Sequence, residues 1–172
     1  YYAIWEIQQY TVTFYQDKDS STVVYTTKAD YGTEYTVPTT TKEGHTFANW
    51  VDAATDTAVA FGATATIPEN GAEYYATWTV NNYTATWVFD NGDANKVDTY
   101  AYNAPVTMPA KPVKSGYTFG GWKDKATGSV VTFPFSMPDR NVELEAVWTA
   151  TPRTITYVYV GAPEDYEAHA AK

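Results

Sequence analysis

Apolar and polar side chains alternate in two stretches of the chain that closely match each other. In residues 10–14 three apolar side chains fall on one face and two threonines on the other, and residues 83–89 repeat this alternation. Because successive side chains of a strand point to opposite faces, a period of two predicts a β-strand in each stretch. Segments rich in Asx, Ser or Gly follow at 17–21 and 90–93, and we expect them to be hairpin turns.

These stretches belong to a longer internal repeat. Three segments begin in the same way, namely Tyr10-Thr-Val-Thr-Phe14, Tyr83-Thr-Ala-Thr-Trp87 and Arg153-Thr-Ile-Thr-Tyr157. Each is preceded by an Ala-x-Trp ending, at Trp5, Trp78 and Trp148, and residues 43–50 match residues 115–122. An internal repeat overrules a domain count that is based on length alone.

The repeat divides the chain into four segments. We assign them to the tail of a preceding repeat (1–9), repeat 1 (10–80), repeat 2 (81–152) and the start of a truncated third repeat (153–172). The segment between the terminal Trp and the next strand has four residues in all three places, whereas loops within the units vary in length. Since linkers between independent domains usually tolerate insertions, this constant length predicts a constrained joint. Asn81-Asn82 would also suit a hairpin turn, but a linker fits all three sequences, and we expect a linker.

The composition favours strands around aromatic cores. Aromatic residues make up 17% of the chain, and threonine is abundant beside them, which is typical of strands. The chain has no cysteine, so disulfides cannot stabilise units of this small size. Large aromatic side chains each bury roughly 150–250 Å² and can supply apolar area instead. We therefore expect a mainly β fold whose cores contain the repeated aromatic residues Phe47, Trp50, Trp78, Phe119, Trp122 and Trp148.

Charge and motifs argue against several classes of function. The net charge is −9 and basic residues form no cluster, so we expect no nucleic-acid partner. No apolar run is long enough to cross a membrane, and we expect no membrane insertion in this segment. His45 aligns with Tyr117 of the other repeat, which indicates a packing position. Because no nucleophile with a base and no carboxylate pair has a recognisable signature, we predict no enzyme activity, no catalytic residue and no cofactor.

The sequence leaves three weaker alternatives open. Asp17-Lys-Asp19 and residues 90–95 carry oxygen ligands suited to Ca²⁺, but neither completes an EF-hand loop, so we assign no metal site. Lys18, Lys96 and Asn141 are conceivable partners in intramolecular isopeptide bonds, although the sequence gives no pairing. Tyrosine is common in recognition surfaces. The tyrosines that we expect not to recur between repeats, and to be exposed for ligand contact, are Tyr25, Tyr31, Tyr35, Tyr100 and Tyr102.

The order of these features resembles a known family. A strand, a turn, a Pro-containing loop, the motif Lys-x-Gly-x-Thr-Phe-x-x-Trp and a final Ala-x-Trp together resemble the Listeria/Bacteroides repeat, the internalin B-type B-repeat. The match is carried by Lys42, Gly44, Thr46, Phe47 and Trp50, and by Lys114, Gly116, Thr118, Phe119, Gly121 and Trp122. Repeat 1 departs from the family pattern at His45 and Asn49, where Tyr and Gly are usual.

The resemblance implies compact β-grasp-like units, arranged end to end on bacterial surface proteins, with no catalytic residue to transfer. We expect a non-enzymatic, semi-rigid stalk or spacer whose partners are neighbouring repeats of the same chain. The alternative is an adhesin that binds a host protein or glycan through exposed tyrosine and loop residues. Either reading implies an extracellular location on a bacterial cell surface, with wall anchoring through segments outside this sequence.

Overall fold

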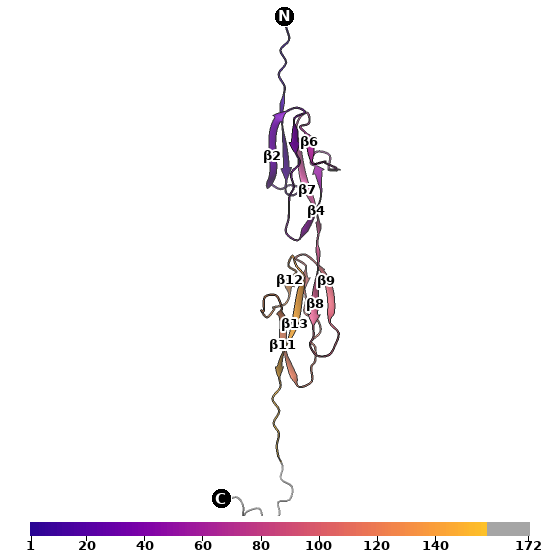
Figure 1. The fold of residues 1–172 in the computed structure, drawn as a ribbon, viewed down its shortest axis with the longest axis vertical. Helices are drawn as coiled ribbons and strands as arrows, with labels where there is room; N and C mark the ends of the chain where they lie inside the picture. Colours follow the sequence, from indigo (N-terminus) through magenta and orange to yellow (C-terminus); the bar gives the residue numbers. More distant parts are fainter. Residues whose placement is uncertain (158–172) are drawn as a thin grey trace, which may run out of the picture.

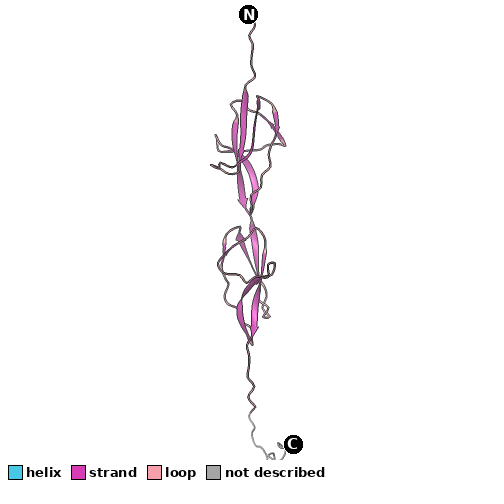
Figure 2. Ribbon diagram, turned by 90° about the vertical axis from the view of Figure 1, so that its left-hand side faces the viewer, coloured by secondary structure: helices cyan, strands magenta, loops and turns pink. Residues whose placement is uncertain are grey.

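The computed structural model describes residues 1–157, which form two units of strands, turns and loops (Figures 1 and 2). Within these residues there are thirteen strands and no helix. The first unit contains β1 (Gln9–Tyr15), β2 (Val23–Asp30), β3 (Glu34–Thr36), β4 (His45–Asp52), β5 (Thr57–Val59), β6 (Thr64–Thr66) and β7 (Ala72–Val80). The second contains β8 (Asn82–Val88), β9 (Lys96–Ala101), β10 (Pro105–Val106), β11 (Tyr117–Asp124), β12 (Phe135–Ser136) and β13 (Val142–Ala150). The prediction of mainly β, tandem repeat domains is confirmed.

Both units are built on the same main sheet. Its strand order is β2-β1-β7-β4-β5 in the first unit and β9-β8-β13-β11 in the second. In each sheet the first and last long strands of the unit are neighbours and run parallel, whereas the other pairs are antiparallel. A two-stranded sheet, β3-β6 or β10-β12, completes each unit.

The alternation along the first strand decides which of its residues form the core. Val12 and Phe14 of β1 are fully buried, whereas the alternating residues Thr11 and Thr13 are more exposed. The first core consists of Val12, Phe14, Tyr35, Trp50, Ile67, Tyr74 and Ala76. The second consists of Ala85, Trp87, Val106, Trp122, Met137, Val142 and Leu144. The two cores share no residue, so each unit has a hydrophobic core of its own.

The repeated aromatic residues are not all in the cores. Trp50 and Trp122 are buried, with 4% and 0% of their surface exposed. Phe47 is instead 36% exposed, because it lies outside the core and packs on Trp50 and Trp78 with ring centroids 5.3 and 5.8 Å apart. Trp78 and Phe119 are half-buried and pack against the buried core residues of their units, and Trp148 is half-buried as well, so these three lie at the margins of the cores. These side chains form a second aromatic layer over the buried Trp of each unit.

The two units follow one another along the long axis of the molecule. The described chain enters at one end of this axis and leaves at the other, and the long strands run roughly along it (Figures 1 and 2). β7 ends at Val80 and β8 begins at Asn82, so one residue separates the last strand of the first unit from the first strand of the second. The predicted segment 153–172 lies mostly outside the described residues.

Candidate functional site: the joint between the units

The backbone of Asn81 is hydrogen-bonded to both units. Its N–H donates to the carbonyl oxygen of Gly44 in the first unit at 2.9 Å. Its own carbonyl accepts from the N–H of Tyr102 in the second unit at 2.8 Å. β7 and β8 pair with different strands and not with each other, so Asn81 connects two sheets and is not a hairpin turn.

The side chain of Asn81 adds further bonds at the same point. Thr46 donates its hydroxyl to the Asn81 Oδ1 at 2.6 Å, and the Asn81 Nδ2 lies 3.5 Å from the hydroxyl oxygen of Tyr83. A residue in a flexible linker would leave these groups to water. Here both the main chain and the side chain of the connecting residue are bonded to the folded units, which restricts rotation about the connection.

The ring of Tyr102 lies directly on Gly44. A Cβ atom at Gly44 would be 2.0 Å from the Cγ of Tyr102, so no other residue fits without displacing the ring. Gly44 also has φ +67°, a conformation that favours glycine. The ring of His45 meets Tyr102 edge-on, with centroids 5.8 Å apart. Glycine is therefore required here both for its backbone conformation and for close contact between the units.

The hydroxyl of Tyr102 lies in a partly desolvated and acidic environment. Burial, together with the neighbouring carboxylate of Glu43, raises the pKa of the Tyr102 hydroxyl above its ordinary value. The shift favours the neutral phenol at the joint.

Each outer end of the molecule contains half of the same arrangement. At the N-terminal end the N–H of Tyr31 donates to the carbonyl of Gln8 at 3.0 Å, as Tyr102 does to Asn81. At the C-terminal end the N–H of Thr151 donates to the carbonyl of Gly116 at 2.8 Å, as Asn81 does to Gly44. Gly116 has φ +79°, but a Cβ there would meet nothing within 4 Å. Each of the two backbone hydrogen bonds of the joint thus recurs at one outer end, and both occur together between the two units.

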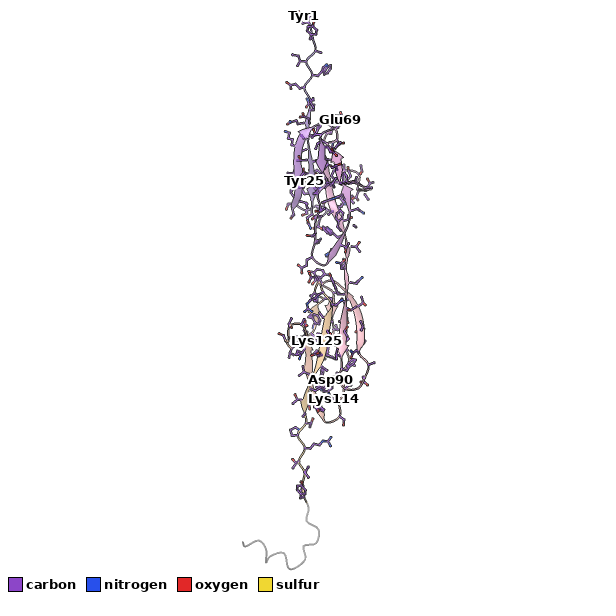
Figure 3. All side chains as sticks on the ribbon, in the orientation of Figure 1. Tyr1, Tyr25, Glu69, Asp90, Lys114 and Lys125 are labelled. Atoms are coloured by element: carbon purple, nitrogen blue, oxygen red, sulfur yellow. The ribbon has the colours of Figure 1, made fainter. Side chains whose placement is uncertain are left out.

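The five tyrosines predicted to be exposed do not lie together. Tyr25 and Tyr35 are both in the first unit (Figure 3), and their stacked rings are 6.5 Å apart. The exposure expected for Tyr35 is wrong: it is 7% exposed, because β3 turns it into the core. Tyr100 is half-buried against the second core, and Tyr102 is in the joint. Only Tyr31, at 61%, is largely exposed. Ligand contact by these residues stays a prediction.

Tyr31 and Tyr102 are equivalent residues, so the expectation that they do not recur is wrong for this pair. Both follow the second strand of their unit and both donate to the residue just before the first strand. The sequence signal was a Tyr directly after β2 and β9. It was hidden because β2 has 8 residues and β9 has 6, which shifts the alignment between the repeats.

The lysine of the repeated motif makes the same contacts in both units. Lys42 forms an ion pair with Asp17 at 2.6 Å, and Lys114 forms one with Asp90 at 3.0 Å (Figure 3). The ammonium groups also lie over the rings of the terminal Trp residues, 5.9 Å from the centroid of Trp78 and, in the second unit, 5.8 Å from that of Trp148. The motif lysine therefore ties the turn after the first strand to the last strand.

The other candidate groups have ordinary structural partners. Lys18 and Lys96 form ion pairs with Asp56 and Asp98, at 2.9 and 2.8 Å. The amide oxygen of Asn141 accepts from the N–H of Thr84 at 2.9 Å. Within residues 1–157 no group of three or more His, Cys, Asp or Glu side chains is arranged to hold a metal ion, and no helix could span a membrane.

Comparison with known proteins identifies relatives of both units. The model of the Listeria-Bacteroides repeat domain matches twice, at residues 10–76 and 83–147. Internalin H of Listeria monocytogenes is 39% identical over 119 residues, which are 67% of this chain and 21% of that protein. A protein of Evansella cellulosilytica whose name describes it as a membrane protein is 33% identical over 159 residues, 87% of this chain and 24% of that protein. A second protein of the same organism, whose name describes it as a Gly-rich membrane protein, is 29% identical over 158 residues, which are 91% of this chain and 18% of that protein. The chain thus spans less than a quarter of each of these relatives.

Proposed function

Because the chain belongs to the Listeria-Bacteroides repeat domain family, we propose that it acts as a semi-rigid, non-enzymatic spacer in a bacterial surface protein. The repeats would hold other parts of that protein at a distance from the cell. Relatives that are named as an internalin and as membrane proteins support a surface association. An extracellular position and anchoring to the cell wall through other segments are part of this proposal.

The observation that carries the proposal is the joint. A spacer maintains a distance only if its units cannot fold back on each other, and this requires a connection that resists bending. Asn81 bonds to Gly44 and Tyr102 through its main chain, and the Tyr102 ring packs on Gly44. The half-joints at Gln8 and Thr151 support extension of the same geometry to further repeats.

The test is a pair of glycine substitutions that differ only in what surrounds them. Gly44→Ala and Gly116→Ala both place a side chain at a positive φ, so they carry a similar backbone strain. Only the Cβ at residue 44 would collide with a ring of the other unit. Small-angle X-ray scattering of each variant measures the maximum dimension and the spread of conformations.

We expect Gly44→Ala to broaden the distance distribution and reduce the maximum dimension, whereas Gly116→Ala leaves both at the wild-type values. Tyr102→Ala and its equivalent Tyr31→Ala give a second matched pair, since only Tyr102 contacts the other unit. If wild type is already flexible, or if all four variants scatter like wild type, the joint does not set the shape and the spacer proposal fails.

One feature favours the adhesin alternative. The first unit has a surface pocket of about 540 Å³ whose lining includes Tyr15, Lys18 and Tyr75. Val88 and Glu145 are the paired residues at the corresponding register of the second unit, so the two tyrosines are not needed to form the fold. Saturable binding in a glycan and matrix-protein screen that Tyr15→Ala abolishes, with folding intact, would support adhesion by this surface.

A further inference from the structure

In each unit the strand at which the chain enters is hydrogen-bonded directly to the strand at which it leaves. Residues 12–15 of β1 pair in parallel with residues 72–75 of β7. Residues 85–88 of β8 pair in the same way with residues 142–145 of β13. Both pairs lie inside their sheets, flanked by β2 and β4 in the first unit and by β9 and β11 in the second.

This arrangement determines how tension along the chain acts on the fold. The ends of the described chain lie at opposite ends of the long axis, and β1, β7, β8 and β13 run roughly along that axis (Figure 1). A pull on both ends therefore drives β1 and β7 past each other along their own directions. The hydrogen bonds of a parallel ladder connect neighbouring strands and are evenly spaced along them, so such a pull loads them together and not one after another.

A side-chain bond joins the same two strands in both units. The indole Nε1 of Trp78 in β7 donates to the carbonyl of Gln16, directly after β1, at 2.9 Å. In the second unit the Nε1 of Trp148 donates to the carbonyl of Phe89 at 2.9 Å. The terminal Trp of the Ala-x-Trp motif thus links the end of the first strand to the last strand, and Lys42 adds its ion pair with Asp17 beside it.

The start of the last strand also lies unusually close to the first strand. In the first unit Gly71 precedes β7, and a Cβ there would lie 2.3 Å from the carbonyl oxygen of Thr11. In the second unit Asn141 occupies this place, and its amide oxygen accepts from the N–H of Thr84. Both units therefore have contacts between first and last strands at each end of the parallel ladder.

We propose that each repeat is a shear clamp that bears tension between its own N- and C-terminal ends. This inference rests on the proposed spacer function and adds a load to it: the array would transmit pulling force to a partner without unfolding. The clamp consists of the parallel ladder between the first and last strands, the contacts of Gly71 or Asn141 at its start, and the Trp bond at its end.

Pulling direction tests the clamp in single-molecule force spectroscopy. The chain has no cysteine, so a pair of introduced thiols gives unique attachment points. Handles at the two chain ends load the ladder in shear. Ser21 lies in the turn after β1 and Thr79 near the end of β7, and both are exposed and lie beyond the C-terminal end of the parallel ladder, so handles at Ser21→Cys and Thr79→Cys open the same bonds one by one.

We expect the first unit to unfold at a severalfold higher force when pulled by the chain ends than when pulled through residues 21 and 79. Equal forces in the two geometries would overturn the clamp. The spacer proposal is tested separately by scattering. Equal unfolding forces in the two geometries together with a narrow distance distribution contradict only the clamp. A higher end-to-end unfolding force together with a broad distance distribution contradicts only the spacer.

The Trp bond has its own matched control. Trp78→Phe keeps an aromatic ring but removes the donor to Gln16, which lies on the path of the force. Trp50→Phe removes a donor to the carbonyl of Pro38, which is away from that path. We expect Trp78→Phe to lower the end-to-end unfolding force more than Trp50→Phe does, after each is compared with its own loss of equilibrium stability in denaturant. If the unfolding force falls in both variants only in proportion to their loss of equilibrium stability, Trp78 has no specific role in the clamp.

Discussion

The two repeats have the same sheet but fill their cores with different side chains. At the centre of the first core Phe14 contacts Tyr74, with ring centroids 4.9 Å apart, and Trp50, at 4.8 Å. In the second core Trp87 takes the place of Phe14 and contacts Trp122 at 5.0 Å, and the ladder partner that corresponds to Tyr74 is Leu144. A larger central ring is thus accompanied by a smaller neighbour, because a close-packed core constrains total volume more than the identity of each residue.

The polar contacts differ in a similar way. Asp52 and Asp124 end corresponding strands, and both accept backbone N–H groups of the following turn. Only Asp124 also forms an ion pair, with the guanidinium of Arg140 at 2.6 Å, and its side chain is 11% exposed. Both repeats thus retain the parallel ladder, the Trp bond and the motif lysine, whereas their core side chains and their other polar contacts differ.

The largest expected effect comes from exchanging core residues between the repeats. Tyr74→Leu removes part of a ring from the first core and should destabilise that unit by about 2–3 kcal/mol, because a cavity remains. Phe14→Trp overpacks the same core and should cost about 1–3 kcal/mol. The double substitution reproduces the pair in the second unit, and we expect it to be more stable than the sum of the single effects by about 1–2 kcal/mol.

Urea unfolding followed by near-UV circular dichroism gives these free energies, with the second unit as an internal reference in the same chain. If the free-energy changes of the two single substitutions simply add in the double variant, the two pairs of side chains are not interchangeable ways of packing the same core volume.

The next effect concerns the ion pair of the second unit. Arg140→Gln leaves the poorly exposed carboxylate of Asp124 without its charged donor, and we expect a loss of about 1.5–2 kcal/mol in the second unit. Lys125→Gln is the control, because Lys125 and Glu143 are both more than a third exposed and such pairs contribute little. An equal cost for both substitutions in urea unfolding would contradict a special role for Asp124.

The same pair predicts a dependence on pH. Partial burial opposes ionisation of Asp124, but hydrogen bonds from Arg140 and from the backbone outweigh it and hold the pKa of this carboxyl below its ordinary value. A carboxyl whose pKa is lowered by folding stabilises the folded state at pH values above its unfolded pKa of about 4. This stabilisation is lost as the pH falls through the pKa of the folded state. We expect the stability of the second unit to fall below about pH 4, and to fall less in Arg140→Gln.

The smallest effect separates the two buried tryptophans. The Nε1 of Trp50 donates to the carbonyl of Pro38 at 3.3 Å, whereas the buried Nε1 of Trp122 has no hydrogen-bond partner in the described residues. Trp50→Phe loses a bond, and Trp122→Phe removes an unsatisfied donor. Beyond the shared loss of ring volume, we expect Trp50→Phe to cost about 0.5–1 kcal/mol more in thermal or urea unfolding. A larger cost for Trp122→Phe would contradict this.

Local patterns in the sequence predicted the strands, the turns and the repeat. The alternation at Val12 and Phe14 predicted a half-buried strand, and the Gly44 and Trp50 motif predicted the family. The parallel pairing of β1 with β7 was not predictable, because the register between strands some 60 residues apart is set by packing and not by local alternation. The contact of Tyr102 with Gly44 was missed because it joins two units, and the recurrence of this tyrosine was hidden by the different lengths of β2 and β9.

The most direct test of a fixed joint is a distance measured across it. Nitroxide labels at Lys28→Cys and Thr99→Cys, which are exposed on β2 and β9, report the separation of the two units by double electron–electron resonance. A joint held by Asn81, Gly44 and Tyr102 predicts one narrow distance peak that broadens in Tyr102→Ala. A broad distribution in the wild-type chain, unchanged by Tyr102→Ala, would contradict the account.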